Sequence, residues 1–184
     1  MKIEKTADEQ NLEKARYRLN LIIIALFCST TLAPCVLFFF TGKGQLIWLV
    51  IFLIVTYLFS LIPKYWYRRW QLSANLSIYR KLKVHLFKKF ATNGDVTNKI
   101  LRRKFPLHRN VKNRDSLAEK LAETYIVEKA HSVLFIFCLL TSAHAFAMKD
   151  IGTGILLTLG NIVFNLYPNF LQQYNRIRYQ KLIH

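Results

Sequence analysis

The apolar residues of this chain are gathered into four runs, and this grouping limits the possible folds more than any other feature. The runs cover residues 19–40, 46–62, 132–148 and 151–171. A bilayer core about 30 Å thick needs roughly 20 apolar residues of helix, and the four runs approach or reach this length. With 53% hydrophobic residues overall, the pattern predicts an all-α integral membrane protein with four transmembrane helices.

The first apolar run is expected to remain in the protein as a membrane anchor. It follows a mostly polar lead-in and lacks a small-residue cleavage site of the kind that ends a secretory signal peptide. Pro34 lies within this run and removes one backbone donor, so we expect a kinked helix there. The hydroxyl groups of Ser29, Thr30 and Thr31 can return hydrogen bonds to the backbone at that point.

Most of the positive charge lies in the connection between the second and third runs. The whole chain carries a net charge of +17, and residues 64–131 hold 17 Lys and Arg against 5 Asp and Glu, a difference of +12. By the positive-inside rule, this connection and both termini are expected in the cytoplasm, and the turns at 41–45 and 149–150 outside it. The predicted location is therefore the cell inner (plasma) membrane, with multiple spans.

These boundaries divide the chain into five predicted parts. They are a cytoplasmic lead-in over 1–18, a first transmembrane hairpin over 19–62, a basic connection over 63–131, a second hairpin over 132–171 and a cytoplasmic tail over 172–184. Because the basic connection lies between two membrane runs, we expect membrane lipid with anionic headgroups as its partner, and no nucleic acid.

The connection contains a predicted amphipathic helix. Apolar residues recur at spacings of three and four from Leu72 to Phe90, with lysine and arginine on the other faces. We interpret this helix as lying on the cytoplasmic membrane surface, although a helix of a soluble bundle would show the same period. The basic segment from Lys99 to Arg109 is expected to be irregular and is a candidate for binding an anionic part of a substrate, such as a phosphate of an acyl donor.

A short acidic and histidine motif stands directly before the third run. On a helix Thr124, Glu128 and His131 share one face, with Glu123 at its edge. The spacing predicts a hydrogen bond from Glu128 that orients His131 and makes it a better general base. A carboxylate-bridged metal pair uses the same Glu-x-x-His spacing but needs a second copy, which this chain lacks, so no metal site is predicted.

A stripe of polar residues follows the fourth run. Its members are Asn161, Asn165, Pro168, Gln172, Asn175 and Tyr179, with Arg176 beside them. Polar side chains in a membrane helix face the protein interior or a cavity, so the stripe is either a contact between helices or a site. Because the third run starts and the fourth ends on the cytoplasmic side, the topology predicts His131 opposite Asn175 and Arg176. A base facing such donors suits group transfer through an oxyanion.

Two motifs resemble one protein family. The pattern E-T-x-x-x-E-x-x-H covers residues 123–131, and N-x-x-P followed by Q-x-Y-N-R-x-R covers residues 165–178. Together they are similar to the glycosyl-4,4'-diaponeurosporenoate acyltransferases, small bacterial membrane proteins of carotenoid pigment synthesis, over roughly residues 79–182. The resemblance implies transfer of a fatty acyl group to a sugar hydroxyl of a glycosylated carotenoid acid. Gln173 stands where the resemblance predicts arginine, and Tyr125 and Ile126 stand where it predicts basic residues.

The sequence therefore predicts a membrane acyltransferase that acts on a glycosylated lipid at the cytoplasmic face. The predicted catalytic residues are His131, Glu128 and Glu123, and the predicted substrate-binding residues are Thr124, Asn165, Gln172, Tyr174, Asn175, Arg176 and Arg178. An acyl donor such as acyl-CoA or acyl carrier protein is expected as a substrate, a lipid-linked or carotenoid-like molecule as the acceptor, and no cofactor. The alternative hypothesis is a non-enzymatic membrane subunit that binds a partner helix through the polar stripe. The three cysteines are interpreted as packed apolar residues.

Overall fold

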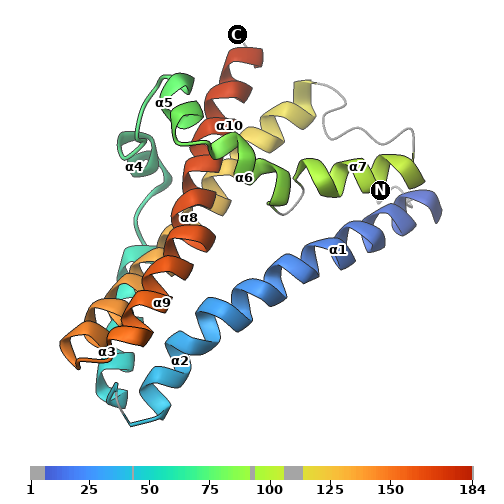
Figure 1. Cartoon of the computed structure of the whole chain (residues 1–184). Coiled ribbons are helices and arrows are strands. Elements are labelled where there is room, and N and C mark those ends of the chain that lie inside the picture. The colour runs from blue at the N-terminus through green and yellow to red at the C-terminus, as the bar shows by residue number, and fades with distance from the viewer. Residues whose placement is uncertain (1–6, 43, 92–93, 106–113, 184) are drawn as a thin grey trace.

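The computed structural model describes residues 7–42, 44–91, 94–105 and 114–183, and these residues form helices and no strands (Figure 1). The N-terminal helices are α1 (Ala7–Phe27), the π-helical turn η1 (Cys28–Leu32), α2 (Ala33–Phe40) and α3 (Leu46–Ser60). The connection forms α4 (Lys64–Arg69), α5 (Leu76–Lys81), α6 (Val84–Phe90) and α7 (Asp95–Lys104). The C-terminal helices are α8 (Arg114–Ala147), α9 (Ile151–Asn161), the π-helical turn η2 (Ile162–Leu166) and α10 (Tyr167–Ile183).

Three described helical segments are long and apolar enough to cross a membrane, so the chain has the character of a membrane protein. They are Gln10–Phe40, Ser116–Ala147 and Ile151–Ile183. The second predicted span corresponds to α3, which has only 15 residues and is about 22 Å long, shorter than a bilayer core of about 30 Å. Four full spans are therefore not confirmed. As expected, the helix of the acidic and histidine motif runs without a break into the apolar run, because both belong to α8.

The helices diverge from one end of the molecule (Figure 1). α8 pairs with α9 and α10, and α3 packs along α8 near the turn that joins α8 to α9. A buried cluster at this end contains Cys35, Phe39, Phe52, Cys138 and Leu157. From there α1 slants away from α8 and α10, and α7 lies against α1 near its start. The space between α1 and the α8–α10 pair is where the candidate site lies.

Two prolines follow π-helical turns. η1 ends two residues before Pro34, and η2 ends two residues before Pro168. Each segment stays helical but contains a wider turn, which adds one residue to the local repeat and rotates the following residues by about 100°. Ser29 and Thr30 donate their hydroxyl groups to the carbonyl of Leu26, as expected near Pro34.

The basic connection differs from the expectation in two places. The predicted single amphipathic helix is divided into α5 and α6, because Lys83 adopts a left-handed backbone conformation with φ of 56°. Residues 99–104 of the segment that was expected to be irregular belong to α7, and Arg109 lies outside the described residues. α5 and α6 pack on α10, and they bury Tyr79 and Val84 against it.

Candidate active site

The antiparallel pairing of α8 and α10 sets the level of each polar residue. Arg176 meets Thr124 and Glu128, and seven residues further along α8 His131 meets Asn165. His131 therefore lies about 10 Å along the helix from the level of Thr124. The predicted position of Arg176 opposite His131 is wrong, because Arg176 pairs with Glu128, whereas Asn175 lines the same cavity as His131.

Glu128 and Arg176 form a buried ion pair. Their exposed fractions are 2% and 0%, and Arg176 Nη2 donates to Glu128 Oε2. Gln173 Nε2 donates to the other carboxylate oxygen at 2.7 Å, and the Arg176 guanidinium lies 3.7 Å from the Tyr125 ring centroid. The predicted hydrogen bond between Glu128 and His131 is wrong, since the carboxylate is taken by a cation and an amide, and a buried charge is stable only when it is paired.

Gln173 joins this ion pair to the basic connection. Its Oε1 lies 3.0 Å from the Tyr79 hydroxyl and 3.1 Å from the backbone N–H of Leu72. Burial raises the pKa of the Tyr79 phenol, so the hydroxyl keeps its proton and can donate. Sequence reasoning assigned no role to Gln173, and its one distinguishing feature was its departure from the residue expected there.

His131 is held by a chain of amides. Its Nδ1 lies 3.5 Å from Asn165 Oδ1, while Asn165 Nδ2 donates to Asn161 Oδ1 at 2.8 Å. Asn161 Nδ2 in turn donates to the carbonyl of Phe135 at 3.0 Å. Because both amide nitrogens donate elsewhere, Asn165 presents its oxygen to the ring. This arrangement assigns the proton of neutral His131 to Nδ1 and leaves Nε2 able to accept a proton.

Proline chemistry supplies a second acceptor beside the ring. Pro168 has no N–H for the carbonyl of Phe164, four residues earlier, and this carbonyl is a hydrogen-bond contact of His131. Two acceptors beside an imidazole restrict the orientation of its ring.

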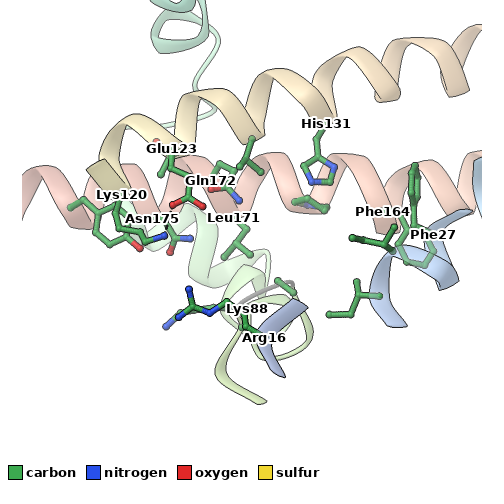
Figure 2. A pocket seen from close by; sticks show the side chains of 18 residues that line it. Arg16, Phe27, Lys88, Lys120, Glu123, His131, Phe164, Leu171, Gln172 and Asn175 are labelled. Carbon is green, nitrogen blue, oxygen red and sulfur yellow. Dashed lines mark hydrogen bonds and ion pairs between the residues drawn. The ribbon is translucent and has the colours of Figure 1, made fainter. Parts of the chain in front are cut away.

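A cavity of about 400 Å³ lies between α1, α6, α8 and α10. Figure 2 shows Lys120, Glu123 and Asn175 toward one end and Phe27 and Phe164 at the other, with His131 between them. Five predicted site residues line the cavity, namely Glu123, Thr124, His131, Gln172 and Asn175.

The other five predicted site residues do not line the cavity. Glu128 and Arg176 form the buried ion pair, and Asn165 is buried behind His131. Tyr174 packs against Tyr79, and the Arg178 guanidinium lies 5.7 Å from the Tyr174 ring centroid.

Sequence reasoning missed the contribution of α1 and α6 to the cavity. Arg16 and Lys88 lie across it from α8 and α10 (Figure 2), and Ile23, Ile24 and Phe27 line it from α1. Lys88 pairs with Asp95 at 3.1 Å. The periodicity of a sequence does not indicate which helices pack together, so no sequence signal could have identified these residues.

The family comparison agrees with this arrangement. The family model for glycosyl-4,4'-diaponeurosporenoate acyltransferase matches residues 63–184. The chain belongs to this family. The match includes both motifs and both helices that carry His131 and its amide partners, and it begins at residue 63 rather than near residue 79. No curated protein and no solved structure matches the chain.

The residues of the polar stripe divide into two groups. Asn161 and Asn165 are 3% and 0% exposed and bond within the chain, whereas Pro168, Gln172 and Asn175 line the cavity. The wider turn η2 contains Asn165 and rotates the residues that follow it relative to Asn161. Among the described residues, no group of three or more His, Cys, Asp or Glu side chains is placed to hold a metal ion.

Proposed function

We propose that this chain is a membrane acyltransferase that moves a fatty acyl group from a thioester donor to a sugar hydroxyl of a glycosylated, carotenoid-like lipid. The observation that carries the proposal is the position of His131. It lines a cavity with one polar and one apolar end, and an amide chain fixes its ring. The acyltransferase family supplies the reaction class.

In the proposed reaction His131 is the general base. Nε2 takes the proton of the acceptor hydroxyl while the hydroxyl oxygen attacks the thioester carbonyl carbon. The tetrahedral intermediate then breaks its carbon–sulfur bond, and the leaving thiolate takes the proton from His131. The products are an oxygen ester and a free thiol. A base in this position contributes about 10²- to 10⁴-fold to the rate.

Gln172 is the proposed donor to the developing oxyanion. It lines the cavity from α10, and Figure 2 shows it on the His131 side of Asn175. The amide N–H of Gln172 can stabilise negative charge without itself carrying a charge. Arg176, the donor expected from the sequence, has a different proposed role, which is to neutralise buried Glu128.

The polar end of the cavity is the proposed site for the sugar and for the carrier part of the donor. Glu123 and Asn175 offer hydrogen-bond partners to a sugar, and Arg16, Lys88 and Lys120 give this end cationic groups. Acyl-CoA and acyl carrier protein are both anionic donors that such groups attract. Because the basic connection adjoins this end, we propose by the positive-inside rule that it lies on the cytoplasmic side of the cell membrane, as do both termini.

The alternative of a non-enzymatic subunit has less support. It requires a polar stripe that is open to a partner helix, yet Asn161 and Asn165 are bonded to each other within this chain. The remaining stripe residues line the cavity beside His131.

Lipid analysis of cells tests the proposed function. Wild type, His131→Ala and His85→Ala are expressed at matched membrane levels in a host that makes glycosyl-4,4'-diaponeurosporenoate, and lipids are compared by mass spectrometry. His85 is exposed on α6, so its variant is the matched control. We expect the acylated product with wild type and His85→Ala and its absence with His131→Ala. Identical lipid profiles in all three strains would contradict the proposal.

A further inference from the structure

We infer that the apolar end of the cavity is the subsite for the acyl chain, and that Phe27 and Phe164 set the length of chain that the protein accepts. The inference rests on the proposed acyltransferase function. It adds which substrate occupies this end and which residues determine chain length.

The cavity changes from polar to apolar along α1 and along the α10 segment with η2. On α1 the lining runs from Arg16 to Phe27, and on α8 it runs from Lys120 to His131. Each stretch spans 11 residue steps, or about 16 Å of helix. The antiparallel α10 segment runs the opposite way, from Tyr179 back to Phe164 across η2. A long molecule bound here would therefore have its polar part at one end and its hydrocarbon part at the other.

The apolar end is closed by two successive contacts. The rings of Phe27 and Phe164 approach each other with centroids 5.8 Å apart and an interplanar angle of 54°. One helical turn beyond Phe27, η1 packs on α9 so closely that a Cβ atom on Gly160 would lie 2.6 Å from Thr31 Oγ1. No larger side chain than glycine fits at residue 160 without movement of Thr31. A chain entering from His131 therefore meets the ring pair and then tightly packed helices.

A closed apolar end suits a fatty acyl chain better than a polyene acceptor. An acyl chain is flexible and has a free methyl end, so it can stop at the ring pair with its carbonyl near His131. A rigid polyene attached to a sugar at the polar end would have to pass through the contact between Phe27 and Phe164.

Acyl-chain selectivity tests the inference. Purified full-length protein receives an equimolar mixture of dodecanoyl, tetradecanoyl, hexadecanoyl and octadecanoyl thioesters with glycosyl-4,4'-diaponeurosporenoate, and product esters are measured by mass spectrometry. Phe27→Ala and Phe164→Ala should each move the preference toward longer chains. Burial of two further methylene groups predicts a rise of about tenfold in the ratio of the longer to the shorter ester.

Two further variants keep the inference testable. Phe40→Ala makes the same change on an exposed face of α2 and should leave the ratio unchanged. Ile23→Phe narrows the same end and should favour shorter chains, which gives a result even if the alanine variants do not fold. An unchanged ester distribution in active Phe27, Phe164 and Ile23 variants would overturn the inference. Loss of product with wild type as well would instead overturn the proposed function.

Discussion

His131 of α8 and Asn165 of η2 meet, with Nδ1 of the imidazole 3.5 Å from Oδ1 of the amide. The amide cannot present its nitrogen instead without losing the 2.8 Å hydrogen bond from Asn165 Nδ2 to Asn161 Oδ1. An uncharged side chain therefore takes the orienting role that the sequence motif assigned to Glu128. In this account the base is positioned by an amide, while the nearby carboxylate stabilises the fold.

Asn165→Leu should slow catalysis without weakening substrate binding. The variant removes the acceptor for His131 Nδ1–H, and loss of one hydrogen bond of about 1–1.5 kcal/mol in the transition state lowers kcat about tenfold. KM should remain unchanged because buried Asn165 does not line the cavity. Steady-state kinetics of the purified protein measure both constants. Asn161→Leu breaks hydrogen bonds on the same face without removing the acceptor of His131, so it should reduce kcat less. Equal losses in both variants would indicate a purely structural role.

Replacing either Glu128 or Arg176 alone should destabilise the protein more than replacing both residues together. Glu128→Met or Arg176→Met leaves an uncompensated buried charge and should lower the free energy of unfolding by about 3–5 kcal/mol. The double variant should recover most of this loss because no charge remains buried. Thermal unfolding in detergent, followed by tryptophan fluorescence, compares the three variants.

The exposed pair of Lys120 and Glu123 is the matched control for that prediction. Its side chains are 35% and 47% exposed, so Lys120→Met should change the unfolding free energy by less than about 1 kcal/mol. Single variants of Glu128 and Arg176 that unfold like wild type would show that the ion pair is not formed.

Gly160→Ala should loosen the contact between α9 and η1. The added Cβ would lie 2.6 Å from Thr31 Oγ1 and 3.3 Å from its Cγ2, and such overpacking costs about 1–3 kcal/mol. Adding Thr31→Ala removes both opposing atoms and should restore stability, as measured by the midpoint of thermal unfolding. Gly152→Ala, also on α9, meets nothing within 4 Å and should be neutral or stabilising by up to about 1 kcal/mol. If Thr31→Ala fails to rescue Gly160→Ala, the helices pack differently.

Cys35 and Cys138 should form a disulfide when an oxidant reaches them. Their sulfur atoms lie 3.6 Å apart between α2 and α8, and a disulfide requires about 2.05 Å, so a small approach is enough. Molecular iodine would oxidise the two thiols, forming the disulfide and two equivalents of hydrogen iodide. A Cys28→Ser background leaves only this pair. Peptide mass spectrometry should find the cross-link there and not after Cys35→Ser, and free thiols at both positions would argue against the α2–α8 packing.

Local features of this fold were predictable from the sequence. The apolar runs indicated helices, and the absence of a breaker between Ser116 and Ala147 indicated a continuous α8. Pro34 and Pro168 marked the two places where the helices depart from α-helical geometry. Such features depend on residues within a few turns of one another, so a single sequence contains the necessary information.

The levels at which helices meet were not predictable in the same way. Topology placed His131 and Arg176 on one side of the membrane, but the pairing of Arg176 with Thr124 separates them by about 10 Å. The extra residue in η2 also rotates the residues of α10 relative to Asn165. The sequence periodicity assumed a regular helix and therefore could not predict this rotation. Arg16 and Phe27 reach the cavity only because α1 lies across it from α8 and α10, an arrangement of segments that are distant in the sequence.

Acyl transfer by the purified protein tests the role of His131 most directly. Wild type, His131→Ala and His85→Ala are placed in lipid nanodiscs with glycosyl-4,4'-diaponeurosporenoate and radiolabelled hexadecanoyl groups carried by CoA or by acyl carrier protein. The account predicts labelled ester from wild type and His85→Ala with at least one donor, and a rate about 10²- to 10⁴-fold lower from folded His131→Ala. Equal rates from wild type and His131→Ala would contradict the account.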